Sequence, residues 1–248
     1  MARCLVTGGA GFIGSHLVDR LVKEKKTVIV LDNLATGNIK NLSNVKNKIK
    51  FINIDISKYS KKFEKLFKNV DLVYHLAALA DIVPSINDPK KYFDTNVNGT
   101  MNVLNAANKN KVKKLIYAAS SSCYGIPKRY PISEEAPINA KYPYALTKYL
   151  AEELILHWGE VYKMKNISLR FFNTYGPRSR TSGVYGAVFG VFLAQRINNK
   201  PLTIVGDGNQ TRDFLFVKDL VEAIILVSKK INETDIFNVA SGKETKVN

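Results

Sequence analysis

Residues 7–14 read Thr7-Gly8-Gly9-Ala10-Gly11-Phe12-Ile13-Gly14, and they are the strongest indication of the fold. An apolar run typical of a strand, Arg3–Thr7, precedes it, and an amphipathic helical pattern, Phe12–Lys25, follows it. Three glycines at this spacing, between a strand and a helix, are the fingerprint of a site that binds a dinucleotide. The start of the chain is therefore expected to form the phosphate-binding turn of a doubly wound α/β sheet.

The three glycines of the fingerprint, Gly8, Gly11 and Gly14, are each expected to have a different structural role. Gly8 permits the tight turn, Gly11 lets a pyrophosphate approach the backbone, and Gly14 allows the helix to pack closely on the sheet. The first helical residues, Phe12 and Ile13, would then face the phosphates with free N–H groups at the positive end of the helix dipole. These five residues are candidate cofactor contacts.

Asp32 ends the next predicted strand, 18 residues after Gly14, near the offset expected for the residue that binds the adenosine ribose. Its carboxylate would accept hydrogen bonds from the ribose hydroxyls and repel a 2′-phosphate, so NAD is expected rather than NADP. Asn33 is expected in the same contact. The alternative is that Asp32 and Asn33 merely start a turn.

Two further strand ends supply candidate cofactor contacts. Asp55 and Ile56 follow the third predicted strand and are placed to contact adenine, although Asp55 could instead cap a helix. The fourth strand ends in His75-Leu76-Ala77-Ala78, whose small residues would let the cofactor lie against the backbone of Leu76, Ala77 and Ala78. His75 itself is interpreted as a packed histidine rather than a catalyst.

The first 172 residues alternate strand-like apolar runs with amphipathic segments, which is typical of a parallel sheet with helices on both faces. The predicted strands are Arg3–Thr7, Thr27–Asp32, Ile49–Asn53, Leu72–His75, Lys114–Ala119 and Ser168–Phe172. The predicted helices are Phe12–Lys25, Lys61–Phe67, Pro89–Asn108 and Tyr144–Tyr162. The sequence therefore predicts a Rossmann-type α/β domain over residues 1–172, with the loops after its strands at one edge.

From residue 173 the pattern changes, and residues 173–248 are interpreted as a smaller substrate-binding lobe. The predicted elements there are helices at Val188–Asn198 and Leu220–Lys229 and strands at Leu202–Val205, around Phe214–Val217 and at Ile236–Ala240. A lobe that stops at Asn248, shortly after a Ser-Gly turn, looks unfinished. A truncated C-terminus is therefore expected.

Composition excludes several classes of protein. The formal net charge is +16, but the lysines are spread over many segments and no RNA- or DNA-binding motif accompanies them, so no specific nucleic acid is expected as a partner. The two cysteines, Cys4 and Cys123, have no metal-type partners nearby, and no metal site is expected. Cys123 is interpreted as an apolar filler rather than a nucleophile.

No apolar run is long enough to cross a bilayer, and the N-terminus leads straight into the first strand, which leaves no room for a signal peptide. A cytoplasmic protein without a membrane partner is expected.

The stretch Tyr144-Ala145-Leu146-Thr147-Lys148 carries the candidate chemistry. A tyrosine and a lysine four residues apart lie on one face of a helix, and an ammonium beside a phenol favours the phenolate. Tyr144 is therefore a candidate base near neutral pH. Alone this spacing is weak, but it follows the glycine turn and the serine cluster Ser120-Ser121-Ser122.

With these motifs in order, and with Thr95-Asn96-Val97-Asn98-Gly99-Thr100 between them, the chain resembles the extended short-chain dehydrogenase/reductases. Within them it is most similar to the NAD-dependent nucleotide-sugar epimerase/dehydratase family, nearest the UDP-hexose 4-epimerases. The resemblance covers essentially the whole chain. It implies a bound NAD, a UDP- or dTDP-sugar substrate and a homodimer formed through two helices, Pro89–Asn108 and Tyr144–Tyr162.

The resemblance also implies roles for single residues. Ser120 would hold the sugar's 4-hydroxyl, with Ser121 and Ser122 as substrate-binding neighbours, and the choice among the three serines stays open. Tyr144 would take the proton of that hydroxyl, while Lys148 would lower the tyrosine pKa and hold the nicotinamide ribose. The remaining cofactor contacts that the resemblance implies are Asn96, Ala118 and Phe171, and Asn96 is also expected to steady the helix that carries Tyr144.

In the second half, the resemblance places Asn173 and Arg212 on the substrate diphosphate and Tyr185 and Val188 near the sugar nucleotide. An arginine fork suits paired phosphate oxygens, although Arg212 could instead form a surface ion pair with Asp213 or Asp219.

Sister reactions stay open as alternatives. The 4,6-dehydratases have an Asp-Glu pair where this chain has Ser121-Ser122, and the sugar-nucleotide decarboxylases usually keep a glutamate where Ser122 stands. Epimerisation at C4 is therefore favoured over dTDP-glucose dehydration or conversion of a UDP-glucuronate. A Rossmann-type protein that binds RNA or a protein partner without catalysis is the remaining alternative, and the presence of both Tyr144 and Lys148 argues against it. The sequence does not fix the sugar or the base.

Overall fold

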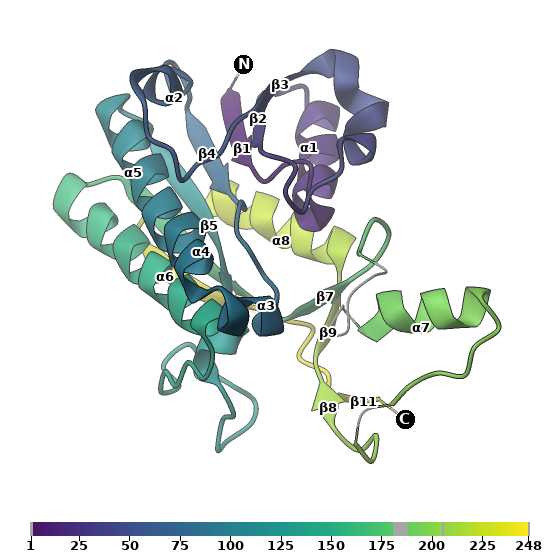
Figure 1. Cartoon of the computed structure of the whole chain (residues 1–248). Coiled ribbons are helices and arrows are strands. Elements are labelled where there is room, and N and C mark those ends of the chain that lie inside the picture. The colour runs from purple at the N-terminus through teal and green to yellow at the C-terminus, as the bar shows by residue number, and fades with distance from the viewer. Residues whose placement is uncertain (1, 181–187, 205, 248) are drawn as a thin grey trace.

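A seven-stranded parallel sheet forms the centre of the molecule in the computed structural model, which describes residues 2–180, 188–204 and 206–247 (Figure 1). The strands lie in the order β10-β6-β5-β4-β1-β2-β3. Their bounds are β1 (Arg3–Thr7), β2 (Thr27–Asp32), β3 (Ile49–Asn53), β4 (Leu72–His75), β5 (Lys114–Ser120), β6 (Lys165–Phe171) and β10 (Asp235–Val239). This is the predicted Rossmann-type α/β fold.

The strand order reverses between β1 and β4, which lie side by side although β2 and β3 separate them in sequence. Thr7 at the end of β1 pairs with Leu31 on one side and with His75 on the other. The loops after β1 and β4 therefore diverge at this point and leave a crevice at the carboxyl edge of the sheet, where ligands of doubly wound folds bind.

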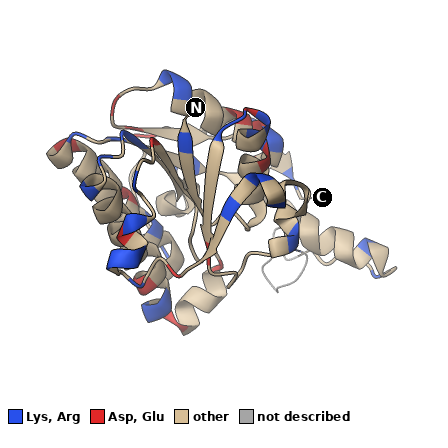
Figure 2. Ribbon diagram, turned by 90° about the horizontal axis from the view of Figure 1, so that it is seen from above, with Lys and Arg blue, Asp and Glu red and all other residues tan. Residues whose placement is uncertain are grey.

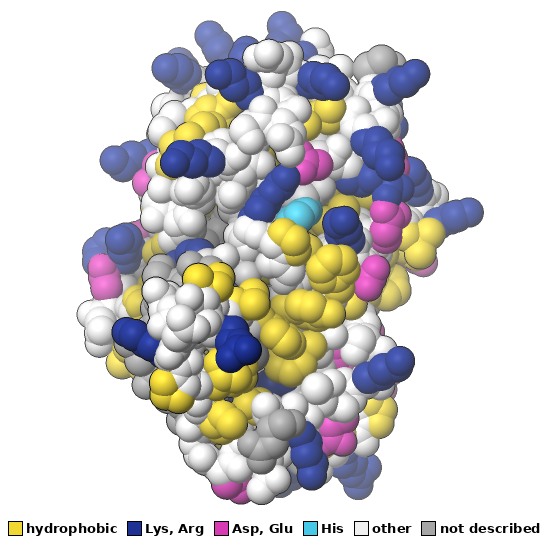
Figure 3. All heavy atoms as spheres, turned by 90° about the vertical axis from the view of Figure 1, so that its right-hand side faces the viewer, with side chains coloured by type: hydrophobic (Ala, Val, Ile, Leu, Met, Phe, Trp, Pro, Cys, Tyr) yellow, Lys and Arg dark blue, Asp and Glu magenta, His cyan; other side chains and the backbone are white. Residues whose placement is uncertain are grey.

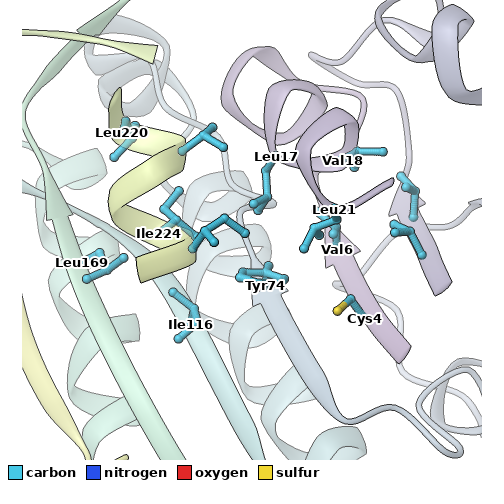
Figure 4. Packing of buried hydrophobic residues seen from close by; sticks show 14 of the residues in the cluster. Cys4, Val6, Leu17, Val18, Leu21, Tyr74, Ile116, Leu169, Leu220 and Ile224 are labelled. Carbon is cyan, nitrogen blue, oxygen red and sulfur yellow. The ribbon is translucent and has the colours of Figure 1, made fainter. Parts of the chain in front are cut away.

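Helices cover both faces of the sheet and bury a separate apolar cluster on each. On one face α1 (Phe12–Lys23) and α8 (Val217–Lys230) pack side by side, so that Leu17, Leu21, Leu220 and Ile224 meet the strand residues below them (Figure 4). On the other face lie α2 (Lys61–Lys65), α5 (Gly99–Lys109) and α6 (Pro143–Tyr162).

One predicted helix is divided in the structure. The segment 89–108 forms α4 (Pro89–Phe93), a π-helical turn (Asp94–Asn98) and α5. A π turn inserts one extra residue in the turn and often marks a functional site. Here it directs Asn96 into the protein, where Asn96 is 1% exposed.

The chain after β6 contributes to the central sheet as well as to the substrate side. Val239 at the end of β10 pairs with Phe171 of β6, and α8 packs on α1. Outside the sheet lie α7 (Val188–Ile197), the parallel pair β7 (Asn173–Tyr175) and β9 (Phe214–Phe216), and the antiparallel pair β8 (Thr211–Arg212) and β11 (Thr245–Lys246). The division into a Rossmann-type domain (1–172) and a substrate-binding lobe (173–248) stays a prediction. Within the second part, α8 and β10 pack with the layers of the central sheet.

The predicted strand at 202–205 is wrong for residues 202–204, which are irregular, and residue 205 lies outside the described residues. Apolar side chains that would suit a strand, Leu202 and Ile204, are partly exposed instead. Leu193 and Ile197 of α7 are exposed as well. Apolar side chains gather on the side of the molecule that carries α7 (Figure 3).

Three short helical elements were not predicted. They are α3 (Ile82–Asn87) and the 3₁₀ segments at Ile39–Lys48 and Ser121–Tyr124. The last of these begins directly after β5 and holds the serine cluster.

Lysines and arginines are distributed over many helices and strand ends rather than along one stripe (Figure 2). No helix in the described ranges has the length and apolar character needed to cross a membrane. Among the same residues, His, Cys, Asp and Glu form no group of three or more that could hold a metal ion.

Candidate active site

A crevice of about 1060 Å³ runs along the carboxyl edge of the sheet, across the point where the strand order reverses. Its size is at the upper end of the range for sites that enclose a small molecule. Most of the predicted cofactor residues line it: Gly8, Gly11, Phe12, Ile13, Gly14, Asp32, Asn33, Asp55, Ile56, Leu76, Ala77, Ala78, Ala118, Tyr144, Lys148 and Phe171.

The glycine turn has the geometry of a phosphate cradle. Gly8 has φ +71°, and a Cβ there would lie 2.6 Å from the backbone N of Ala77. The sequence suggested close packing of the helix on the sheet as the reason for Gly14. In the structure, a Cβ on Gly14 would lie 2.2 Å from the Gly8 carbonyl oxygen, so the turn itself requires this glycine. Gly11 precedes α1 without a side-chain cap, which leaves the first helix amides available to an anion.

Asp32 stands at the end of β2, and its carboxylate is already tied to the surrounding backbone. The Ala10 N–H donates to Oδ2 at 2.9 Å and the Leu34 N–H donates to Oδ1 at 2.8 Å. Burial raises the pKa of this carboxyl, while the two N–H groups lower it. Each oxygen keeps a further lone pair, so Asp32 can hold the loop and still accept a bond from a ribose hydroxyl.

We expect Asp32→Ala to weaken NAD binding roughly 10- to 100-fold, because a charged acceptor in a buried position is worth about 1.5–3 kcal/mol. Calorimetric titration with NAD measures this. Asp71→Ala is the matched control, since Asp71 also accepts a backbone N–H, that of Arg3 at 3.0 Å, but lies at the opposite end of the sheet. Equal NAD affinity in the two variants would contradict the ribose contact.

Asp55 fits both of the interpretations made for it. Its Oδ1 accepts bonds from the N–H of Ser57 at 2.9 Å and from the hydroxyl of Ser57 at 2.8 Å, as in a local turn, and it also lines the crevice. His75, by contrast, is fully buried between the hydroxyls of Thr7 and Thr100. Burial lowers its pKa to about 3, so it is a neutral packing residue, as expected from the sequence.

Ser120, Tyr144 and Lys148 come together at the other end of the crevice and all line it. Ser120 is the last residue of β5, while Tyr144 and Lys148 lie one turn apart on α6. The Ser120 and Ser122 hydroxyls lie 2.8 Å apart, and both lie close enough to the phenol of Tyr144 to lower its pKa. This is the constellation predicted for proton transfer.

The pKa values of the pair differ from the expectation in one respect. Burial raises the pKa of Tyr144, and the groups that lower it are the hydroxyls of Ser120 and Ser122. Burial lowers the pKa of Lys148 to about 7, while Glu152 one turn further along raises it. Its ammonium nitrogen stands 4.1 Å from the centre of the Tyr117 ring. Lys148 is not among the groups that lower the pKa of Tyr144, so the expected effect of the lysine on the tyrosine is not seen in the protein alone.

Asn96 was predicted to contact the cofactor, but it lies behind the crevice wall and does not line it. Its amide nitrogen donates to the Leu79 carbonyl and to the Thr147 hydroxyl, both at 3.0 Å, and its oxygen accepts the Leu79 N–H at 2.9 Å. Thr147 in turn donates to the Tyr144 carbonyl at 3.0 Å. Asn96 thus ties the loop after β4 to the first turn of α6.

The predicted substrate residues are less well gathered. Ser121 and Ser122 lie next to Ser120 but not on the crevice wall. The side-chain amide of Asn173 donates to the Asp213 carbonyl at 3.2 Å. Arg212 is exposed, and its guanidinium donates to the Thr211 carbonyl at 2.7 Å. The Asp213 carboxylate accepts the N–H groups of Ser241 and Gly242. Tyr185 lies outside the described residues, as does the side chain of Val188.

The crevice also contains charged residues that the sequence did not single out. Arg178 and Arg180, in the loop after β7, line it together with Asp81. Arg178 pairs with Asp19 of α1 at 2.7 Å, and Arg180 binds both oxygens of Asp81 at 2.7 and 2.9 Å. The sequence gives only a local signal for these two arginines, the polar run Arg178-Ser179-Arg180, because both partners are far away along the chain.

The glycine cradle, the acidic residue at the end of β2 and the Ser-Tyr-Lys group beside one crevice define a dinucleotide-dependent enzyme of the doubly wound α/β class. The model of the NAD dependent epimerase/dehydratase family matches residues 4–240. The chain belongs to this family, and its cofactor is NAD.

Two relatives and one solved structure place the chain within the family. A candidate UDP-glucose 4-epimerase from Methanocaldococcus jannaschii is 42% identical over 245 residues, which cover 98% of this chain and 78% of that protein. A UDP-N-acetyl-α-D-glucosaminuronate decarboxylase from Bacillus cytotoxicus is 36% identical and is covered to 77%, against 99% of this chain. The UDP-N-acetylglucosamine 4-epimerase from Methanobrevibacter ruminantium, solved with UDP-N-acetylmuramic acid, has a TM-score of 0.94 at 35% identity, covering 99% of this chain and 78% of that one.

Proposed function

We propose that this protein interconverts the C4 epimers of a nucleotide-diphosphate sugar, with NAD as a bound cofactor and a 4-keto sugar as the intermediate. The observation that carries the proposal is that Ser120, Tyr144 and Lys148 share the wall of the dinucleotide crevice, with Tyr144 and Lys148 one helical turn apart. The epimerases among the relatives support the reaction type.

Within this site each residue has a defined task. Ser120 orients the sugar's 4-hydroxyl, and Tyr144 accepts the proton of that hydroxyl and returns it later in the cycle. Lys148, on the same face of α6, holds the nicotinamide ribose and supplies positive charge when protonated. NAD supplies the acceptor, and afterwards the donor, of the C4 hydride.

Inversion requires that the 4-keto sugar turn within the site, so that C4 receives the hydride on its opposite face while the 4-oxygen regains its proton from Tyr144. NAD is regenerated in each cycle, and the reaction consumes no external oxidant. The nucleotide diphosphate would anchor the turning sugar, and Asn173 and Arg212 are the residues proposed to hold it. Both lie in strands β7 and β8 outside the central sheet, where they can approach a ligand from the substrate side.

The serine cluster favours epimerisation over the sister reactions. Ser121 and Ser122 carry hydroxyls where the 4,6-dehydratases have an Asp-Glu pair. The sugar-nucleotide decarboxylases usually keep a glutamate where Ser122 stands. A hydroxyl cannot protonate a leaving group as a carboxylic acid does near neutral pH. A decarboxylase among the relatives keeps this alternative open to test.

The test is incubation of the protein and NAD with UDP-glucose, UDP-N-acetylglucosamine or UDP-glucuronate, followed by NMR of the anomeric protons. We expect the C4 epimer of one donor without net formation of NADH. A UDP-pentose would instead indicate decarboxylation, and a 4-keto-6-deoxy sugar would indicate dehydration. The same spectra identify the sugar.

We also propose that the enzyme forms a homodimer through two helical segments, residues 89–108 and α6. We further propose that it works in the cytoplasm. Apolar side chains on the outer surface of α6 support the dimer, since Leu146, Val161 and Tyr162 are each about half exposed. Analytical ultracentrifugation would reveal a dimer, and cell fractionation would test the location.

A further inference from the structure

Helix α6 begins without a cap of its own, although it carries the proposed base. Tyr142 occupies the N-cap position and makes no side-chain bond to the helix, and Pro143 at the first helical position has no N–H. The N–H of Tyr144 is therefore the first backbone donor of the helix. Such donors have no partner inside a helix and need one outside it.

Ser85, from α3, supplies this partner across 59 residues of sequence. The Tyr144 N–H donates to Ser85 Oγ at 3.1 Å. The Ser85 hydroxyl donates its own proton to the Ile82 carbonyl at 2.5 Å, which leaves the oxygen as an acceptor toward Tyr144. Ser85 is 0% exposed, so water does not compete for this bond.

The first turn of α6 is thus held on two sides. Ser85 binds the amide of Tyr144, while Thr147, itself held by Asn96, donates to the carbonyl of Tyr144. The phenol of the same residue lies close to Ser120 and Ser122, and Tyr144 and Ser120 both line the crevice. Movement of the backbone at Tyr144 would therefore displace the phenol from the serines.

We infer that Ser85 is a positioning residue for the proposed epimerisation: its hydroxyl caps α6 from another element and so fixes the Tyr144 phenol at the reacting 4-hydroxyl. The inference rests on the proposed function. A displacement of about 1 Å in a reacting group can cost about 100-fold in rate. Removal of the Ser85 hydroxyl would therefore lower turnover by displacing the Tyr144 phenol.

The test compares Ser85→Ala with Ser60→Ala. Ser60 makes the same kind of bond, since its Oγ accepts the Phe63 N–H at the start of α2 at 3.1 Å, but it does not line the crevice. Both variants lose one capping bond, but Ser60 is exposed and water can replace its bond, so Tm should fall more in Ser85→Ala than in Ser60→Ala. We expect kcat to fall roughly 10- to 100-fold in Ser85→Ala alone, with KM and NAD affinity within about twofold of the wild type.

Three measurements separate the outcomes. Equal kcat in the two variants would overturn the inference, as would a loss of NAD binding in Ser85→Ala, because either would make Ser85 a structural residue only. Ser85→Thr keeps the acceptor oxygen and should retain kcat. If Ser85→Ala does not fold, a loss of kcat in a folded, NAD-bound Ser85→Thr would also contradict positioning.

Amide hydrogen exchange gives a readout that needs no sugar. In Ser85→Ala, peptides that contain Tyr144 should exchange faster than in the wild type, and in Ser60→Ala they should not. If the wild type converts no nucleotide sugar, the proposed function fails while this exchange difference still tests the cap. If the wild type is active and the exchange is unchanged, the inference about Ser85 fails alone.

Discussion

Replacement of Tyr144 with phenylalanine is expected to reduce turnover by about 100- to 10,000-fold, which is the usual contribution of a positioned general acid–base group. The phenylalanine keeps the ring and loses the hydroxyl that contacts Ser120 and Ser122. Single-turnover kinetics, with the nucleotide sugar that the NMR experiment identifies as substrate, would measure the loss of turnover. NAD binding should persist, because the glycine turn and Asp32 lie at the other end of the crevice.

Tyr142→Phe is the matched control for this substitution. Tyr142 precedes the same helix and is exposed, so the loss of its hydroxyl should leave kcat unchanged. Full turnover in Tyr144→Phe would remove the proposed mechanism. Loss of NAD from this variant would instead mean that Tyr144 acts on the pocket as a whole.

Replacement of Lys148 with methionine is expected to make the protein more stable and nearly inactive. Lys148 is 4% exposed, and burial lowers its pKa from 10.5 to about 7. Between these pH values the unfolded chain holds a proton that the folded chain releases. Stability therefore rises with pH across this window, and the cost of the lysine is fully present below about pH 7.

Each unit of pKa difference corresponds to about 1.4 kcal/mol, so the free energy of unfolding of Lys148→Met should exceed that of the wild type by a few kcal/mol near neutral pH. The gain should shrink as the pH approaches 10.5. Thermal unfolding of the protein without added NAD, at several pH values between 6 and 9.5, would measure it. Lys23→Met, on the exposed end of α1, should change neither stability nor turnover.

A Lys148→Met variant that is less stable than the wild type at every pH would show that the lysine is well accommodated when charged. Glu152 and the face of Tyr117 are the groups that would do this. The expected result would instead mark Lys148 as a residue kept for function at a cost in stability.

The parts of the fold that local sequence determines could be predicted closely. The glycine turn between β1 and α1 is specified by residues within 14 positions of one another, and so are β2 and its terminal Asp32. The Tyr144–Lys148 pair follows from helical spacing, but its grouping with Ser120 could be predicted only through the resemblance, because nothing local brings β5 and α6 together.

Features that depend on distant partners could not be predicted. The π turn at Asp94–Asn98 interrupts a continuous helical pattern because Asn96 bonds Leu79 and Thr147. The ion pairs of Arg178 and Arg180 and the cap from Ser85 join residues 59 or more positions apart. Sequence patterns of short period carry no record of such contacts.

The position of β10 at the edge of the sheet has a consequence for how this enzyme could diversify. The chain leaves the sheet after β6, forms the substrate side and returns through α8 and β10 to pair with β6 again. Topologically, residues 172–216 are an insertion whose two ends are fixed by neighbouring strands. Changes within that insertion that keep the crevice residues Thr174, Arg178 and Arg180 would therefore act on the proposed substrate side, while the hydrogen bonding of the sheet is preserved.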